Sequence, residues 1–289
     1  MKKRPTNAIL IIGSHGFLGK NIRKMLEHHD HIFTSMRGDT EHVFDSLGTM
    51  IGFDAFAKFE LVTVFNCSSG RLQTVELSNE SNFLFPTNVL DELSRLSSRI
   101  IWIQFDSYTQ NTSGRIHDKN YVDSKNKFNN ELDKKASTNS LLEYIRISLP
   151  HLYGPGDNSS RFLPKVFSKL LKGIDVQVTS SREVLPLIDV EDCAKEVIAI
   201  SIQRTMSGKK SLHTKVSVPP TENIELYYFL NSFKEFLNSE SLISRGQDDS
   251  NVFIEKWEKH EQPLVFLSQE NRSSREETFR KLKEDLEQT

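Results

Sequence analysis

The chain has 289 residues, of which 37% are hydrophobic and 26% are charged. This balance is typical of a globular protein, and the length allows one large domain or a core with a smaller lobe. The formal net charge of −2 gives no reason to expect nucleic-acid or membrane binding. The apolar run at residues 8–13 is too short to cross a bilayer and lacks a signal-peptide cleavage site.

The chain contains two cysteines, Cys67 and Cys193. Two thiols without a cysteine cluster argue against a disulfide scaffold and against a zinc site. We therefore expect no structural metal and a cytoplasmic location.

The first half alternates short apolar runs with amphipathic segments, which predicts an α/β fold with a parallel sheet covered by helices. We expect strands at residues 8–13, 32–36, 43–45, 61–67, 100–105 and 141–149. Apolar residues recur at helical spacing in 17–28, 82–96 and 120–136.

The alternation weakens after residue 156. We expect a strand at 176–178, a loop over 238–250, and helices at 162–172, 190–205, 221–237 and 274–287. This pattern predicts a dinucleotide-binding domain over residues 1–155 and a smaller mixed α/β lobe over 156–289. The helix at 190–205 is expected to pack back on the first domain.

A glycine-rich turn joins the first predicted strand to the first predicted helix, through Gly13, Ser14, His15, Gly16, Phe17, Leu18 and Gly19. Glycines allow the backbone to approach a pyrophosphate closely, and the helix N-terminus offers free N–H groups. The turn therefore predicts dinucleotide binding on a Rossmann-type, doubly wound sheet. The alternative is that the glycines serve packing only.

The end of the second predicted strand bears on the choice of cofactor. NAD enzymes place an acid there, roughly 20 residues after the turn, whereas an arginine accommodates the 2′-phosphate of NADP. This chain has Ser35 and Arg37 in that position, and Asp39 lies further along. The pattern favours NADP(H), with NAD(H) as the alternative if Arg37 is only a solvated loop residue.

Tyr121 and Lys125 stand four residues apart, on one face of a predicted helix. A tyrosine hydroxyl is a weak acid, and a neighbouring ammonium favours its ionised form. Such a pair can exchange a proton with a carbonyl or hydroxyl while hydride moves to or from nicotinamide. Ser107 ends the fifth predicted strand, at the carboxyl edge where ligands bind, so its hydroxyl is a candidate partner for the substrate oxygen. The alternatives are a solvated helix face and a turn-starting serine.

Residues 7–200 resemble the extended short-chain dehydrogenases/reductases, the NAD-dependent epimerase/dehydratase family that modifies nucleotide sugars. The resemblance rests on Gly13, Gly16, Gly19, Ser107, Tyr121 and Lys125, and on the segments 44–46, 65–69, 82–88, 152–156 and 188–192. It implies that Ser107, Tyr121 and Lys125 form a catalytic triad and that Asp45 contacts the adenine ring. It also implies cofactor contacts at Ser46, Cys67, Ser68, Ser69, Asn82, Tyr121, Lys125 and Leu149, with Lys125 on the nicotinamide ribose.

Some positions depart from the family pattern. Leu185 stands where many relatives have an arginine that grips the substrate diphosphate, so Arg161 or Arg182 is expected to substitute, unless these are surface residues. His151 replaces an asparagine and is expected either to touch substrate or to be packed in the protein.

The residues after Ser107 are Tyr108 and Thr109, so the Asp-Glu pair of the family's dehydratases is missing. We expect an NADPH-dependent ketoreductase that acts on a nucleotide-linked 4-keto-6-deoxy sugar. The alternatives are an epimerase with retained NAD and a non-catalytic NADP-binding sensor. A homodimer is compatible with the sequence.

Overall fold

The computed structural model describes residues 7–35, 41–70, 74–107, 119–178, 184–207, 213–246 and 272–288. Within these ranges, no helix is long and apolar enough to cross a membrane.

An eight-stranded sheet forms the centre of the larger body, in the order β11-β7-β6-β5-β1-β2-β3-β4. Its parallel strands are β1 (Asn7–Ile12), β2 (Ile32–Ser35), β5 (Leu61–Asn66), β6 (Arg99–Ser107), β7 (Leu142–Leu149) and β11 (His213–Ser217). Several of these strands are almost entirely apolar, because side chains on both of their faces are buried.

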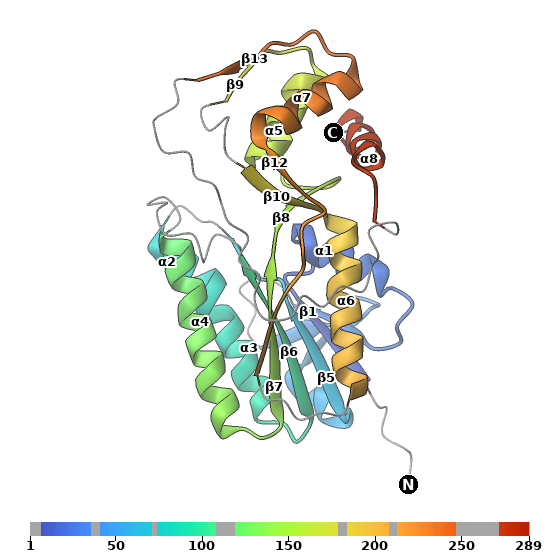
Figure 1. Cartoon of the computed structure of the whole chain (residues 1–289). Helices are drawn as coiled ribbons and strands as arrows, with labels where there is room; N and C mark the ends of the chain where they lie inside the picture. The colour runs from blue at the N-terminus through green and yellow to red at the C-terminus, as the bar shows by residue number, and fades with distance from the viewer. Residues whose placement is uncertain are drawn as a thin grey trace.

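Helices cover both faces of the sheet (Figure 1). Side chains of β6 alternate between two cores: Ile100 and Trp102 pack toward α3 (Phe85–Ser94) and α4 (Lys119–Thr138). Ile101 and Ile103 pack toward α1 (Phe17–Met25) and α6 (Val190–Ser207). The helix expected at 82–96 begins earlier, as α2 (Val75–Asn79) and a π-helical turn (Glu80–Leu84) that leads into α3. This arrangement confirms the doubly wound α/β fold.

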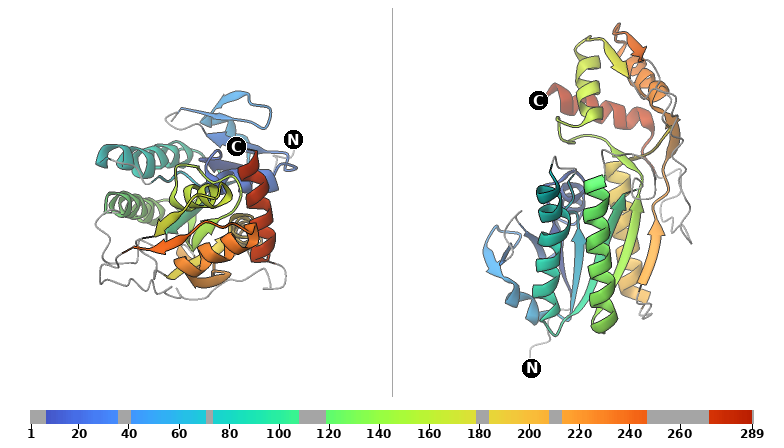
Figure 2. Two further views of the ribbon diagram at one scale, coloured as in Figure 1. Left: turned by 90° about the horizontal axis from the view of Figure 1, so that it is seen from above. Right: turned by 90° about the vertical axis from the view of Figure 1, so that its left-hand side faces the viewer.

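A smaller lobe lies beyond the carboxyl edge of the sheet (Figures 1 and 2). β7 ends at Leu149 and the first lobe strand begins at His151, so the lobe starts directly at that edge. It contains β8 (His151–Tyr153), α5 (Phe162–Leu171), β9 (Val176–Val178), β10 (Val184–Asp189), β12 (Glu222–Glu225), α7 (Leu226–Leu237), β13 (Ile243–Arg245) and α8 (Arg275–Glu287). Its core is aromatic and includes Phe167, Phe229, Phe233 and Phe279.

Four sequence predictions need correction. The loop expected over 238–250 contains β13, which pairs with β9. The strand expected at 43–45 is β3 (His42–Phe44), which runs antiparallel to β2 and continues into β4 (Met50–Gly52) through a hairpin. The lobe expected over 156–289 is interrupted, because β11 returns to the large sheet beside β7. The start of the helix expected at 221–237 is instead β12, whose backbone pairs with β10. The differences at β11, β12 and β13 come from pairing with a strand distant in sequence, which local periodicity does not report. The strand β3 pairs instead with its neighbours in the chain, β2 and β4.

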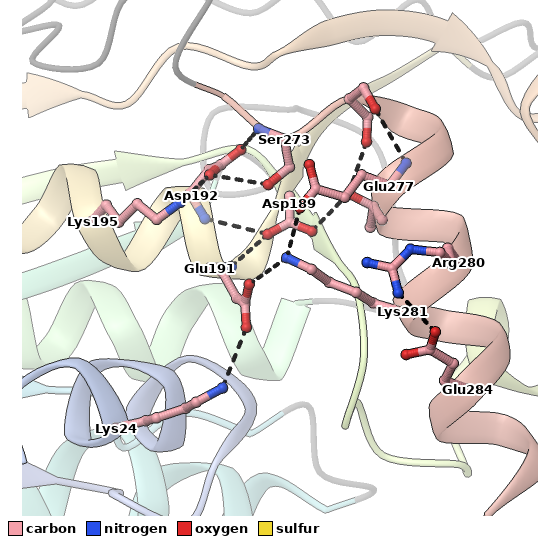
Figure 3. Close-up of polar contacts among 12 residues, drawn as sticks. Lys24, Asp189, Glu191, Asp192, Lys195, Ser273, Glu277, Arg280, Lys281 and Glu284 are labelled. Carbon is pink, nitrogen blue, oxygen red and sulfur yellow. Dashed lines mark hydrogen bonds and ion pairs between the residues drawn. The ribbon is translucent and has the colours of Figure 1, made fainter.

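Helix α8 ties the lobe to the larger body through polar contacts (Figure 3). The Lys281 ammonium bonds Glu191 on α6 at 2.8 Å, and Glu191 lies 3.6 Å from Lys24 on α1. Thr278 donates to the carboxylate of Asp189 at 2.8 Å. The Lys281 contact holds the pKa of Glu191 below its ordinary value, so this link stabilises at neutral pH and weakens on acidification.

The aromatic lobe core generates a stability prediction. Phe229 is fully buried, with its ring centre 5.2 Å from that of Tyr153 and 5.6 Å from that of Phe279. Phe229→Ala should lower the free energy of unfolding by about 3–5 kcal/mol because it leaves a cavity. Tyr228→Ala, at an exposed position next to it, should cost about 0.5 kcal/mol. Urea denaturation measures both, and equal losses would contradict this packing.

Candidate active site

The glycine turn after β1 is crowded by backbone from the neighbouring strand. Gly13 has a φ of +72°, and a Cβ there would lie 2.8 Å from backbone atoms of Cys67 and Ser68. A Cβ on Gly19 would lie 2.2 Å from the carbonyl oxygen of Gly13. Glycine is therefore required at both positions by contact with backbone, not by local turn preference alone.

The surroundings of this turn fit a dinucleotide. Helix α1 begins after Gly16, which has no side chain to cap the first amides, so these N–H groups remain directed at the carboxyl edge. Ser35 ends β2 beside Ile12, and its buried Oγ has no hydrogen-bond partner within the described part of the chain. A buried unpaired hydroxyl next to a helix N-terminus suits the polar face of a cofactor.

The loop after β5 is held against the turn. The Cys67 amide donates to the carbonyl of Ile12 at 2.9 Å, and the Ser68 amide donates to Asn66 at 3.2 Å. Burial raises the pKa of the Cys67 thiol, which therefore stays protonated at neutral pH. In this structure Cys67 belongs to the wall of the candidate site.

Tyr121 and Lys125 meet at the carboxyl edge, as their spacing predicts. Lys125 is almost fully buried, and its ammonium donates to the carbonyl oxygen of Phe105 at 2.7 Å. The Lys125 nitrogen lies 5.7 Å from the centre of the Tyr121 ring. The Ser69 hydroxyl donates to the Tyr121 hydroxyl at 3.3 Å. This geometry fits a tyrosine that exchanges a proton beside a fixed positive charge.

Ser107 ends β6, and its backbone is in register with Leu149 at the end of β7. Both residues therefore lie at the same edge as the glycine turn, where Ser107 is expected to contact substrate and Leu149 to contact the cofactor. The carbonyl that holds Lys125 comes from β6 only two residues before Ser107, so one strand end serves both candidate catalytic groups.

Asn82 links the loop after β5 to helix α4. Its side-chain oxygen accepts from the Gly70 amide at 2.9 Å, and its amide nitrogen donates to Gly70 and to Ser124, each at 3.0 Å. Both N–H groups thus bond within the protein, and the cofactor contact implied for Asn82 stays a prediction. Ser124 lies between Tyr121 and Lys125 in the chain, so the hydrogen bonds of Asn82 hold this part of α4 beside the loop after β5.

The adenine contact implied for Asp45 and the cofactor contact implied for Ser46 stay predictions. Because β3 is antiparallel, Asp45 follows Phe44 toward the amino edge of the sheet, away from the glycine turn. Its carboxylate accepts from the amides of Leu47 and Thr49 at 2.9 and 2.8 Å. These contacts make Asp45 the closing residue of a hairpin turn.

The predicted substrate residues have different environments. The Arg161 guanidinium lies 6.0 Å from the ring centre of Phe17 in the glycine turn and bonds Asp157 at 2.9 Å. His151 is partly buried on β8, paired in register with Leu187 of β10. Arg37 and Arg182 lie outside the described residues.

Comparison with known proteins agrees with this geometry. A family model described as the NAD dependent epimerase/dehydratase family matches residues 9–212. A CDP-abequose synthase of Salmonella muenchen is 26% identical over 167 residues, which cover 57% of this chain and 55% of that protein. This chain thus matches about half the length of that relative.

Solved structures show the same fold. The UDP-glucose 4-epimerase of Thermus thermophilus in complex with NAD has a TM-score of 0.66 at 16% identity, covering 97% of this chain and 99% of that one. A GDP-L-fucose synthetase from Naegleria fowleri has a TM-score of 0.71 at 13% identity, covering 100% of this chain and 95% of that one. These likenesses confirm the architecture expected from the sequence.

The energetic cost of crowding at Gly13 can be measured separately from the cost of its positive φ angle. Gly48 also has a positive φ, +79°, but an added Cβ there would meet no atom within 4 Å. Gly48→Ala should cost about 1–2 kcal/mol of unfolding free energy from strain alone. Gly13→Ala should cost more, because backbone must move as well. Denaturant unfolding compares the two, and a Gly13→Ala loss no larger than that of Gly48→Ala would show that the close approach is not a constraint.

Proposed function

Because this chain belongs to the NAD dependent epimerase/dehydratase family, the extended type of short-chain dehydrogenase/reductase, we propose that it is an NADPH-dependent ketoreductase. Its proposed substrate is a nucleotide-linked 4-keto-6-deoxy sugar. The observation that carries this proposal is the Tyr121 and Lys125 pair, held at the carboxyl edge by the carbonyl of Phe105.

The cofactor would lie across the glycine turn. The amides of Gly13 to Gly19 would hold its pyrophosphate at the start of α1, and Ser35 and Arg37 would hold the ribose and its 2′-phosphate. Cys67, Ser68, Ser69 and Leu149 would line the nicotinamide side of the site. β2 ends at Ser35 with no acid in the last position, which supports NADP(H) over NAD(H). When bound, the nicotinamide supplies the hydride.

The protein's own residues would manage the proton and the charge on the keto oxygen. Ser107 would donate a hydrogen bond to that oxygen, and Tyr121 would transfer its hydroxyl proton to it as negative charge develops. The Lys125 ammonium, fixed by its bond to Phe105, would stabilise the resulting tyrosinate. The Ser69 hydroxyl, 3.3 Å from the Tyr121 oxygen, would then donate to the tyrosinate.

Two features bear on the substrate. Tyr108 and Thr109 follow Ser107, so elimination of water by a neighbouring Asp-Glu pair is not available. Because one relative is named a CDP-abequose synthase, CDP-linked sugars are the first class of substrate to test. Arg161 extends from the lobe to the glycine turn and is the proposed phosphate contact of the substrate, with His151 and Arg182 as further candidates.

Tyr121→Phe tests the proton transfer. The ring remains but the transferable proton is lost, so kcat should fall by at least about 10²-fold. NADPH should still bind, because the glycine turn would carry the pyrophosphate contacts; fluorescence titration checks this. Turnover close to that of the parent protein, with cofactor bound, would remove Tyr121 from the mechanism.

The decisive experiment supplies 4-keto-6-deoxyhexoses linked to CDP, dTDP, GDP and UDP and follows NADPH absorbance. Oxidation of one NADPH per deoxyhexose nucleotide formed is the expected result, with slower turnover on NADH. Interconversion of a UDP-hexose with its epimer, at no net cofactor cost, would identify an epimerase instead. NADPH binding without turnover of any keto sugar or UDP-hexose would favour a sensor.

A further inference from the structure

A buried carboxylate joins three elements next to the proposed catalytic residues. Asp106 is 8% exposed, near the end of β6. One of its oxygens accepts from the side-chain amide of Asn129 on α4 at 2.9 Å. The other accepts from the Arg146 guanidinium on β7 at 2.8 Å. The carboxylate thus fastens the end of β6 to α4 on one side and to β7 on the other.

The chain position of Asp106 gives these contacts a bearing on the active site. The preceding residue is Phe105, whose carbonyl accepts from Lys125 at 2.7 Å, and the following residue is Ser107. Asn129 lies one helical turn beyond Lys125, on the same face of α4. The hydrogen bond between Asn129 and Asp106 therefore limits the rotation of α4 about its own axis and the position of Lys125 along the direction of β6.

Stability alone does not account for an ionic group at this place. Trp102, Phe128 and Leu132 already pack α4 against the sheet, with the ring centres of Trp102 and Phe128 5.5 Å apart. Burying a carboxylate and a guanidinium carries a desolvation cost that apolar packing avoids. The directional bonds of Asp106 supply what apolar contacts lack, which is a defined geometry at one end of the helix.

We propose that Asp106 is a positioning residue for the reaction: through Asn129 and Arg146 it sets Lys125 and Ser107 in their working positions relative to Tyr121. Asp106 does not itself touch substrate or cofactor. This inference rests on the proposed function only in assigning catalysis to these three residues.

The test compares Asp106→Asn with a matched control. In Asp106→Asn an NH2 group, which donates hydrogen bonds, replaces one carboxylate oxygen. The side chain can then no longer accept from both Asn129 and Arg146. The control is Tyr144→Phe, which removes the hydrogen bond from Tyr144 on β7 to Asp133 on α4. That bond joins the same strand and the same helix further from the site. Asp106→Asn should lower kcat by about tenfold to a hundredfold with little change in KM. Tyr144→Phe should lower stability and leave kcat unchanged.

An exchange variant checks the donor and acceptor pattern. In Asp106→Asn combined with Asn129→Asp, the new amide donates to the new carboxylate on α4 and its oxygen accepts from Arg146. At least part of the lost turnover should return. Equal kcat losses in Asp106→Asn and Tyr144→Phe, or no recovery in the exchange variant, would overturn the proposal.

A measurement without sugar substrate separates this inference from the proposed function. Ultraviolet difference titration against the matching Tyr121→Phe protein reports the pH at which Tyr121 ionises. Loss of the Asp106 charge alone would favour tyrosinate and lower that pH, whereas displacement of Lys125 raises it. An upward shift in Asp106→Asn supports positioning even if no keto sugar is turned over, and a downward or absent shift contradicts it. Asn129→Ala, which changes no charge, should shift the same way and serves if Asp106→Asn does not fold.

Discussion

A buried ammonium group is the constraint around which the candidate active site is built. Lys125 is 3% exposed, and an ammonium removed from water must be compensated by hydrogen bonds. The structure supplies the main-chain carbonyl of Phe105 at 2.7 Å. To make that bond, α4 must lie against the carboxyl end of β6. This placement brings Tyr121, one turn earlier on the helix, to the same edge as Ser107.

The other wall of the site depends on close backbone contact. Gly13 allows the turn after β1 to touch the backbone of Cys67 and Ser68, and Gly19 allows α1 to touch the turn. The loop after β5 is thereby fixed next to the start of α1, and Ser69 in that loop reaches the Tyr121 hydroxyl. The glycine turn and the candidate catalytic pair, Tyr121 and Lys125, are thus parts of one connected region, although they lie far apart in the chain.

The lobe is joined to this surface by polar links. Lys20 on α1 donates to the carbonyl of Gly156, and the Gly156 amide donates to Asp285 on α8 at 2.7 Å. Arg272 bonds the buried Glu196 of α6 at 3.0 Å. The contacts of Glu191 and Asp189 add to these links (Figure 3). Together they connect α1, which follows the glycine turn, with α8. A substrate between sheet and lobe would meet side chains whose relative positions are held by charge-assisted bonds.

The sequence by itself determined the parallel core, the glycine turn and the pairing of Tyr121 with Lys125. Each of these is a local pattern: an apolar run, a glycine spacing, or two residues one helical turn apart. Tertiary structure decided what depends on partners distant in the chain. β11 returns to the sheet beside β7, and β12 pairs with β10 where the local pattern predicts the start of a helix. Asp106 is an ordinary polar residue in the sequence, and for Asn82 the family resemblance implies only a cofactor contact. The approach of α4 to the loop after β5 and to β6 gives both side chains their hydrogen-bond partners. Side-chain hydrogen bonds require donor and acceptor within about 3 Å, and no one-dimensional pattern reports such a distance between residues far apart in the chain.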